Sequence, residues 1–429
     1  MTAHEPDRAP TLQAKVGLIA GAGSVPLEIA EAVTGSGREI HVIALRDIAD
    51  ADFAGFHHTT VGLGQVGRML RTLHATGCKK FIMSGGMERP NLLSLTPDLG
   101  FFLHLRTILG LMRGGDDTVL RKILRFFESQ GFEAVGIGDI APSLLAARGP
   151  LTSSPLATSL QSDAKLAFEI VDELSAFDIG QAIVVHRGEP IGIEAAEGTD
   201  GLLHKLSPHL ASGGTLVKAT KPNQELRADL PTIGPRTIEA AATLKLSNIA
   251  VEAGRSVIAQ RATTTSNAEA SGICIVGIDR PPRQVSASIS PTDEDRSLEH
   301  RILNASPKRQ AWINETMLAA RVLSRITKWK SQAAVCTSRQ RVLSIALGDE
   351  ANEIVNNISQ IRQWSDRSGR HRDAAIAFTH AEVITPSVLS GAADRGVRSV
   401  AFLKSVDAEQ LAALTDICNR HNLELVDLS

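Results

Sequence analysis

A group of acidic, basic and amide side chains between residues 178 and 229 has the composition that phosphoryl chemistry needs. Carboxylates can hold Mg²⁺, cations can neutralise charge that develops on phosphate oxygens, and a further polar group can orient a water molecule. The members fall in predicted loops or at strand ends, where functional residues concentrate. They are Asp178, Gln181, Glu197, Thr199, Asp200, Lys218, Lys221, Gln224, Arg227 and Asp229.

Asp229 is the member whose backbone the local sequence restricts most. Leu230 and Pro231 follow it, and a proline disfavours helical backbone in the residue before it, so the chain here should be stiff and extended. Such a segment would hold the carboxylate in one place. The alternative is that Asp229 pairs with Arg227 or caps a turn. Lys218 and Lys221 have an equally ordinary alternative as solvated surface charges.

A glycine-rich turn between a predicted strand and a predicted helix offers a second kind of anion site. Residues 17–26 are GLIAGAGSVP, with Gly23 and Ser24 at the turn and Pro26 early in the helix. A turn of this type directs free backbone N–H groups and the positive end of the helix at a phosphate. The alternative is a tight turn that needs glycine only for its positive φ angle, and this segment alone favours neither.

The same turn argues against a nicotinamide-dependent oxidoreductase, because Pro26 replaces the third glycine of the G-x-G-x-x-G pattern. Residues 62–67 (GLGQVG) do fit that pattern, but they follow a short polar strand. In addition, no acidic residue ends a strand about 20 residues later, as a dinucleotide site requires. We interpret this match as accidental and keep only Gln65 as a candidate ligand contact.

A further loop, residues 84–90 (SGGMERP), follows a buried strand. In open α/β sheets ligands bind beyond the carboxyl ends of the strands, so Gly86 and Met87 are expected to face the same crevice as Gly23 and Ser24. The alternative is an ordinary loop in which Gly86 only turns the chain.

The order of strands and helices predicts an α/β protein with three parts. Residues 15–147 alternate strands with helices, which implies a parallel sheet and a Rossmann-like N-terminal domain. A second, catalytic α/β domain is predicted at 155–280, a linker at 281–300, and a small additional C-terminal α/β unit at 301–429. Residues 1–14 are polar and are expected to form a disordered lead-in.

Composition excludes several classes of protein. Lys and Arg number 45 against 47 Asp and Glu, and no basic block suggests nucleic-acid binding. The four cysteines form no CxxC pair, so neither a zinc cage nor a disulfide framework is indicated, and a reducing cytoplasm fits. The N-terminus has no signal-peptide pattern. The most hydrophobic stretch, residues 101–112, is either a buried core helix or an apolar surface for acyl chains.

Seven motifs occur together in the order, and at roughly the spacing, of one known family. They are GLIAGAGSVP, GLGQVGRML, SGGMERP, GDDTVLRK, FDIGQAIVV, AEGTDGLL and KPNQELRADLPTIGPRTI. Residues from about 15 to 280 therefore resemble the LpxI family, the UDP-2,3-diacylglucosamine pyrophosphatases of lipid A biosynthesis. The resemblance implies hydrolysis of the pyrophosphate by water attack on the α-phosphorus, with Mg²⁺ required. The implied products are UMP and lipid X (2,3-diacylglucosamine 1-phosphate).

The resemblance also implies roles for particular residues. The family's essential aspartate lies in its R-x-D-L-P-T-I-G motif and corresponds to Asp229, which is expected to be catalytic and to bind the metal with Asp200 and Glu197. The two domains are expected to enclose the substrate. Its expected contacts come from the glycine turn, the strand-end loops and the lysine motif: Gly23, Ser24, Gln65, Gly86, Met87, Gln181, Ala182, Thr199, Lys218 and Lys221.

The chain departs from the family in length, because family members typically end near the equivalent of Ile278. We expect the extra residues, 301–429, to be dispensable for hydrolysis. The enzyme is expected in the cytoplasm, with a lipid-nucleotide substrate and no nucleic-acid partner, and both peripheral contact with the inner membrane and a homodimer are compatible with this. The alternative function is a non-catalytic UDP-sugar-lipid binding or regulatory protein.

Overall fold

The structure is a computed structural model in which two compact units are formed by several separate stretches of chain. Unit 1 comprises residues up to Ala146 together with 223–234 and 254–264, and unit 2 comprises 147–222, 235–253 and the residues from Thr265 onward. The predicted lead-in at 1–14 and the predicted linker at 281–300 lie outside the described residues. The described residues are 15–87, 96–104, 116–222, 224–280, 307–359, 374–404 and 406–428.

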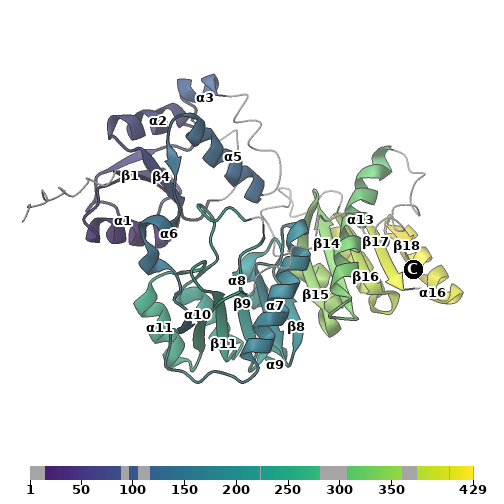
Figure 1. The fold of residues 1–429 in the computed structure, drawn as a ribbon. Helices are drawn as coiled ribbons and strands as arrows, with labels where there is room; N and C mark the ends of the chain where they lie inside the picture. Colours follow the sequence, from purple (N-terminus) through teal and green to yellow (C-terminus); the bar gives the residue numbers. More distant parts are fainter. Residues whose placement is uncertain are drawn as a thin grey trace, which may run out of the picture. The chain divides into compact units, whose positions relative to one another are not determined.

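Unit 1 is built around a five-stranded sheet in the order β3-β2-β1-β4-β5, of which β1 and β4 are labelled in Figure 1. All neighbouring strands are parallel. β1 and β2 are buried along their whole length, as expected for parallel strands that helices cover on both faces. This order is that of the Rossmann arrangement, so the prediction for the N-terminal fold is confirmed. The strands β1 to β5 are Val16–Ala20, Ile40–Leu45, His58–Val61, Lys80–Ser84 and Glu133–Ala134.

Helices cover both faces of this sheet. α1 and α6 pack against one hydrophobic cluster, and α2 and α5 pack against another. β1 divides its side chains between the two clusters, with Leu18 in the first and Ile19 in the second, because alternate strand residues point to opposite faces. The helices of unit 1 are α1 (Val25–Gly35), α2 (Val66–Ala75), α3 (Leu99–Leu103), α5 (Asp116–Ser129) and α6 (Ile137–Ile140), with the 3₁₀ turn η2 (Pro142–Leu144).

Two segments from later in the chain complete unit 1. β10 (Thr232–Ile233) pairs in parallel with β12 (Val257–Ile258). The backbone N–H of Gln260 donates to both carboxylate oxygens of Glu28 in α1, at 3.0 and 2.9 Å. Asp229 therefore belongs to the same compact unit as the glycine turn, although it follows the first part of unit 2 in the sequence.

Unit 2 contains two sheets, of which the first is six-stranded with the order β6-β13-β11-β9-β7-β8. β9, β11 and β13 are parallel, while β7 runs antiparallel to both β8 and β9. Consequently the carboxyl ends of β8, β9, β11 and β13 lie at the same edge as the amino end of β7. The strands β6 to β9 are Gly149–Pro150, Ala182–His186, Glu189–Ile193 and Thr215–Lys218, and β11 and β13 are Asn248–Glu252 and Cys274–Ile278.

The second sheet of unit 2 lies in the C-terminal part and has the order β15-β14-β16-β17-β18. β14 is antiparallel to both its neighbours, and β16, β17 and β18 are parallel. The α/β fold predicted for this part is confirmed. The strands β14 to β18 are Ala333–Ser338, Arg341–Leu347, Ala374–His380, Val397–Lys404 and Glu424–Asp427.

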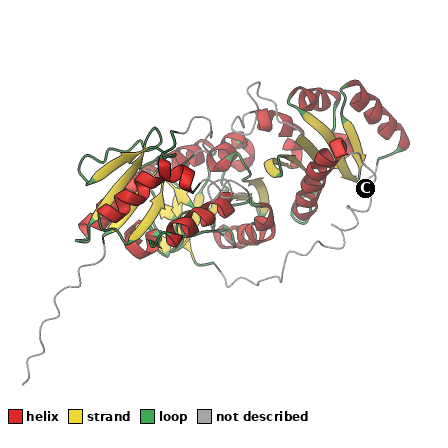
Figure 2. Ribbon diagram, turned by 90° about the horizontal axis from the view of Figure 1, so that it is seen from above, coloured by secondary structure: helices red, strands yellow, loops and turns green. Residues whose placement is uncertain are grey.

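The two sheets of unit 2 share one hydrophobic core. α7 (Leu160–Leu174) and α13 (Pro307–Ile326) contribute to a single cluster with residues of both sheets, such as Val217 and Val335. α14, α15 and α16 pack on the other side of the C-terminal sheet, and Figure 2 shows helices on both sides of the strands there. The remaining helices are α8 (Gly198–Lys205), α9 (Pro208–Ala211), α10 (Pro235–Thr243), α11 (Arg261–Ala270), α14 (Ile354–Ser359), α15 (Pro386–Asp394) and α16 (Ala408–Arg420). The 3₁₀ turns are η3 (Ser175–Phe177), η4 (Gly348–Glu353) and η6 (Ala381–Val383).

Hydrophobic surface is concentrated at α3. Leu99, Phe102 and Leu103 are exposed, so the described start of the apolar stretch 101–112 is not a buried core helix. Residues 105–112 of that stretch lie outside the described residues. Within the described chain, no helix combines the length and the apolar character needed to span a bilayer.

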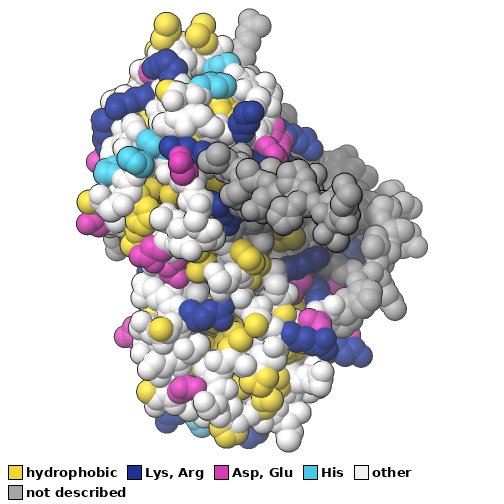
Figure 3. Space-filling view, turned by 60° about the vertical axis from the view of Figure 1, so that its left-hand side comes forward, with side chains coloured by type: hydrophobic (Ala, Val, Ile, Leu, Met, Phe, Trp, Pro, Cys, Tyr) yellow, Lys and Arg dark blue, Asp and Glu magenta, His cyan; other side chains and the backbone are white. Residues whose placement is uncertain are grey.

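Charged side chains are mixed on the surface. On the face shown in Figure 3, Lys and Arg side chains are interspersed with Asp and Glu and form no continuous basic band. This distribution agrees with the net charge of -2.

Candidate functional site

Two loops of unit 1 meet between β1 and β4, where the strand order of the first sheet reverses. The N–H of Gly21 donates to the carbonyl of Ser84 at 2.8 Å, and Ala22 and Gly86 exchange two backbone hydrogen bonds of 2.9 and 2.8 Å. Ligand sites in open α/β sheets form at such a switch point. The structure therefore places the glycine turn and the loop that carries Gly86 and Met87 side by side, as the sequence predicts.

Close backbone approach explains which of these positions must be glycine. A Cβ atom on Gly21 would lie 2.6 Å from the carbonyl oxygen of Gly86. Gly85 has a φ of 100°, and its Cβ would lie 2.7 Å from the carbonyl carbon of Gly21. Gly23 also has a positive φ, 96°, but within the described chain no atom lies within 4 Å of where its Cβ would be. Gly21 and Gly85 thus hold the loops together, whereas Gly23 leaves space for a ligand.

An acidic side chain already uses one of the amides at this turn. The N–H of Gly23 donates to Oδ1 of Asp50 at 2.7 Å, while the Ser24 side chain makes no capping bond at the start of α1. The sequence analysis did not single out Asp50, because it lies 27 residues away in the loop after β2. A phosphate that binds this amide must therefore displace the Asp50 carboxylate.

The second glycine motif, residues 62–67, serves packing. The Oε1 atom of Gln65 accepts from the N–H of Gly62 at 3.0 Å. A Cβ on Gly67 would lie 2.9 Å from the Cα of Gly100 in α3, and the Asp98 carboxylate accepts from the N–H of Gly67 at 3.1 Å. The lack of a side chain at Gly67 lets α3 pack closely here. This packing role supports the interpretation that the match to the dinucleotide pattern is accidental. A ligand contact by Gln65 stays a prediction.

Asp229 is held in unit 1 by its own loop. Its N–H donates to the carbonyl of Glu225 at 2.9 Å, and its Oδ2 accepts from the side-chain amide of Gln224 at 2.7 Å. The neighbouring Ala228 packs against the cluster on one face of the first sheet, and Leu230 packs against the cluster on the other face. Asp229 thus closes a turn that begins at Glu225, and its two neighbours anchor it on both faces of the sheet.

Arg227 fixes the base of the same loop. Its guanidinium donates twice to the Glu225 carboxylate, at 2.8 and 2.9 Å, and once to Glu128 of α5 at 2.7 Å. The hydrogen bonds to Glu225, and then those to Glu128, raise the pKa of Arg227 above its ordinary value. This arginine remains charged and ties the loop to the helix.

A second group of predicted residues meets at one edge of the six-stranded sheet of unit 2. Ala182, the first residue of β7, lies opposite Lys218, the last residue of β9. The carbonyl of Gln181 accepts from the N–H of Ala219 at 3.0 Å, and the carbonyl of Ala182 accepts from the N–H of Glu194 at 2.9 Å. The structure thus brings Gln181, Ala182 and Lys218 together.

Glu194 is the residue at this edge that the sequence analysis missed. Only 9% of it is exposed. The Thr199 hydroxyl donates to its Oε1 at 3.2 Å, and its Oε2 has no hydrogen-bond partner among the described residues. Burial raises the pKa of Glu194, Lys218 opposes the rise and Glu197 adds to it. Glu194 directly follows β8, and an acidic residue beside an apolar strand was the signal that could have found it.

The two lysines at this edge are not solvated surface charges. Lys218 is buried, and the ammonium of Lys221 pairs with Asp178, with 12% of the lysine side chain exposed. The surface alternative is therefore wrong for Lys218, and Lys221 is held in place by a neighbouring acid.

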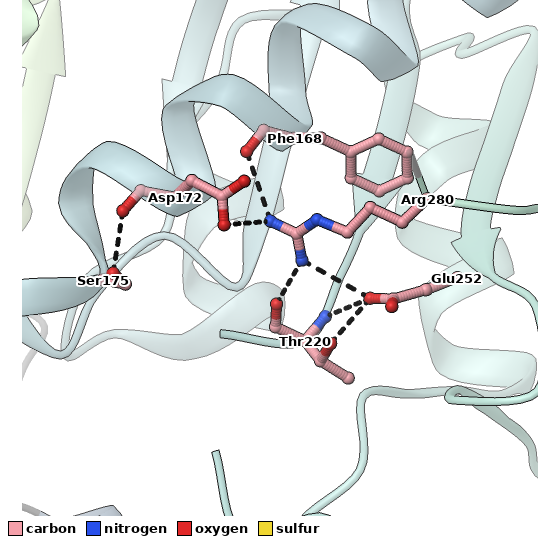
Figure 4. A network of polar contacts seen from close by, with 6 residues as sticks. All are labelled: Phe168, Asp172, Ser175, Thr220, Glu252 and Arg280. Carbon is pink, nitrogen blue, oxygen red and sulfur yellow. Dashed lines mark hydrogen bonds and ion pairs between the residues drawn. The ribbon is translucent and has the colours of Figure 1, made fainter. Parts of the chain in front are cut away.

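A buried network fixes the turn that carries the two lysines (Figure 4). Arg280 follows β13, is 5% exposed, and donates to the carbonyl of Thr220 at 2.5 Å and to Asp172 at 2.7 Å. Glu252, at the end of β11, accepts from the N–H and the hydroxyl of Thr220 at 3.0 and 2.7 Å. It also lies 3.5 Å from the Arg280 guanidinium. Because Thr220 lies between the two lysines in the sequence, this network fixes the course of the backbone that carries them.

The two acids predicted to bind a metal with Asp229 are each paired with a cation. Glu197 pairs with Lys205, and Asp200 pairs with Arg236 at 2.5 Å. Among the residues that the structure describes, no group of three or more His, Cys, Asp or Glu could hold a metal ion. Either acid would have to leave its cation to bind a metal, and their role as ligands stays a prediction. Mg²⁺ is commonly held by one or two carboxylates together with substrate phosphates, and Asp229 alone is compatible with that pattern.

Two regions of the chain match known domain families. Residues 15–144 match the LpxI N-terminal domain, and residues 147–276 match the LpxI C-terminal domain.

The chain belongs to the LpxI family. It is 36% identical over 277 residues to UDP-2,3-diacylglucosamine pyrophosphatase LpxI of Caulobacter vibrioides. The alignment covers 63% of this chain and 99% of the relative. The family predicted from the seven motifs is thereby confirmed.

The LpxI domains and the compact units coincide at one boundary and differ at others. The change from the N-terminal to the C-terminal LpxI domain falls where unit 1 passes into unit 2, after Ala146. Asp229, however, lies in the LpxI C-terminal domain by sequence and in unit 1 by packing. Residues of α13 and of the C-terminal sheet lie beyond the family match, yet they share the core of unit 2.

Proposed function

We propose that this chain hydrolyses the pyrophosphate bond of UDP-2,3-diacylglucosamine, a step of lipid A biosynthesis. Water attacks the α-phosphorus, so its oxygen remains on UMP, and lipid X leaves as the second product. The observation that carries the proposal is the match of both LpxI domains, together with a relative of that name aligned over 99% of its length.

The two units contribute different chemistry to this reaction. In unit 1, the N–H of Gly23 donates to a phosphate oxygen once the Asp50 carboxylate has been displaced, and the fixed carboxylate of Asp229 is the catalytic group. In unit 2, the ammonium of Lys218 offsets negative charge on the phosphates. Gln181, Thr199 and Lys221 complete the set of proposed substrate contacts.

Mg²⁺ is part of the proposal, with Asp229 as the carboxylate that would hold it. When bound, the ion would polarise a phosphate oxygen and neutralise charge on the diphosphate. Glu197 and Asp200 would join it as further ligands only by leaving Lys205 and Arg236.

The proposed substrate carries two acyl chains, so we place the reaction in the cytoplasm at the surface of the inner membrane. The exposed apolar side chains of α3, namely Leu99, Phe102 and Leu103, support a contact with acyl chains or lipid. Binding to liposomes, with and without Leu103→Ser, measures this part of the proposal separately from hydrolysis.

The decisive experiment follows UMP release by wild type and by Asp229→Asn, with Mg²⁺ and with a chelator. We expect metal-dependent turnover that falls by about 100-fold or more in the variant, the range for loss of a positioned catalytic group. Asparagine keeps the size of the side chain and an oxygen for the Gln224 bond. Asp416→Asn, which removes an exposed acid paired with Arg420 in α16, is the matched control and should leave activity unchanged.

The outcomes separate the two candidate functions. Wild type that binds the substrate without releasing UMP would support the non-catalytic alternative. Full activity of Asp229→Asn would remove Asp229 from the mechanism while leaving the enzyme assignment in place.

A further inference from the structure

The C-terminal sheet, which lies outside the LpxI match, is bonded to the segment that carries Thr199 and Asp200. β15 is an edge strand of the C-terminal sheet, β8 is an edge strand of the six-stranded sheet, and the two lie against each other. Directly after β8, the N–H of Ala196 donates to the carbonyl of Val342 in β15 at 3.3 Å. The C-terminal sheet thus reaches the turn between β8 and α8.

Lys205 makes a second link between the same two parts. It is the last residue of α8, and its side chain extends back along the helix to pair with Glu197, which precedes the first turn. Eight residues, or more than two helical turns, separate Glu197 from Lys205, so both side chains must extend toward each other along the helix. The same ammonium donates to the carbonyl of Ile345 in β15 at 2.9 Å. One buried cation therefore joins both ends of α8 to the C-terminal sheet.

Burial makes these links specific rather than incidental. The side chains of Lys205 and Glu197 are 6% and 8% exposed. Water cannot readily replace a partner at such a depth, so loss of either group leaves an uncompensated buried charge. The carbonyl of Ile345 is thus part of what keeps the Lys205–Glu197 pair, and with it α8, in one arrangement.

The contacts continue from α8 to the candidate site. The Thr199 hydroxyl, in the first turn of α8, donates to Glu194. The Glu194 backbone bonds to Ala182, which lies opposite Lys218. A displacement of α8 would therefore disturb Thr199 and Glu194 first.

The rest of the interface holds the C-terminal sheet firmly on unit 2. Residues of α7 and α13 share one hydrophobic cluster. Arg325 and Lys328 both donate to Glu173 of α7, at 2.7 and 2.8 Å. Lys330 donates to Glu189, the first residue of β8, at 2.6 Å. β15 is therefore a fixed support rather than a loose neighbour.

We propose that the C-terminal sheet positions the substrate-contact segment of the LpxI site, with Lys205 as the positioning residue that joins β15 to α8. This inference rests on the proposed function. It replaces our expectation that the extra C-terminal part is dispensable for hydrolysis.

The test uses the full chain with three lysine variants. Lys205→Met removes the ammonium but keeps the length of the side chain, and Lys205→Arg restores a cation that can reach both acceptors. Lys330→Met is the matched control, because it removes a lysine from the same interface at the opposite end of β8. Hydrogen exchange of residues 195–206 and the kcat and KM of UMP release are measured for each protein.

For Lys205→Met we expect exchange of residues 195–206 to rise about tenfold and kcat/KM to fall about tenfold, with partial recovery of both in Lys205→Arg. Lys330→Met should leave both quantities unchanged, even if its melting temperature falls. Unchanged exchange or unchanged kcat/KM in Lys205→Met would overturn the inference.

Two further results keep the test decisive. If wild type releases no UMP, the proposed function fails, and the exchange data still decide whether β15 holds α8. If Lys205→Met does not fold, hydrogen exchange in the wild-type protein provides the test. The free energy of opening measured at the Ala196 amide should equal that measured for β15, Arg341–Leu347. Exchange of Ala196 at the rate of a free loop would overturn the inference.

Discussion

At the edge of the first sheet main-chain hydrogen bonds hold the loops together, whereas at the edge of the six-stranded sheet buried charged side chains hold the turn. The loops of Gly21 and Gly86 bond to each other through the main chain. The turn around Thr220 is instead held by Arg280 and Glu252. The first edge therefore requires residues without side chains where its two loops meet. The second edge requires that each buried charged group keeps its partners.

The two edges should therefore be sensitive to different kinds of substitution. A backbone site tolerates changes of charge but not an added Cβ atom, because the main chain cannot move aside. A buried charged site tolerates small changes of shape better than the loss of one partner, since the remaining charge cannot be solvated. The three predictions that follow test this contrast.

Arg280→Met should have the largest effect. It removes the guanidinium from Thr220, Asp172 and Glu252, and should reduce the free energy of unfolding of unit 2 by about 3–5 kcal/mol, the range for a broken buried ion pair. Arg280→Lys should recover part of this loss, because lysine keeps the charge but lacks the planar fork. Thermal and urea unfolding measure both variants.

The control for this prediction is a neighbouring surface pair. Arg148 and Asp279 are 3.0 Å apart and mostly exposed, so Arg148→Met should cost no more than about 1 kcal/mol. Equal losses for Arg148→Met and Arg280→Met would contradict the view that burial makes the second edge sensitive to charge.

Gly21→Ala should have the next largest effect, at the other edge. Its Cβ would meet the carbonyl oxygen of Gly86 at 2.6 Å, and the strain should destabilise unit 1 by about 1–3 kcal/mol. Gly86→Ala is the matched variant, because its Cβ would meet nothing closer than 4.0 Å. It should keep the melting temperature and instead reduce substrate affinity. Similar melting temperatures for the two variants would show that the loops can separate without cost.

A pH-dependent effect at Glu194 should be the smallest. Burial raises its pKa above the ordinary 4.5, with Lys218 and Lys221 opposing and Glu197 adding to the rise. The folded protein therefore holds this proton more tightly than the unfolded chain. The resulting stability is fully present below the ordinary pKa and is lost as pH rises through the raised one.

Comparison of wild type with Glu194→Gln measures this effect. Above pH 4.5 the melting temperature of wild type should fall relative to that of the variant, by no more than a few °C. Glutamine keeps an acceptor for the Thr199 hydroxyl. A difference between the two proteins that does not change with pH would contradict the raised pKa.

Much of the fold and part of the candidate site followed from local sequence. Alternating strands and helices predicted the α/β class, and the position of Gly86 directly after a strand predicted that it would meet the glycine turn. These inferences succeed because strand ends in parallel sheets converge whatever the connecting loops do.

Contacts between residues far apart in the chain were decided only by the tertiary structure. Local pattern placed Asp229 with Lys218, but its flanking residues pack in the core of unit 1. The burial of Glu194 and the bond from Lys205 to Ile345, 140 residues away, leave no mark in the sequence around them. The sequence by itself determined the family, the class of fold and the strand-end positions. The tertiary structure decided which charges are buried together, because burial depends on elements that meet only after the whole chain has folded.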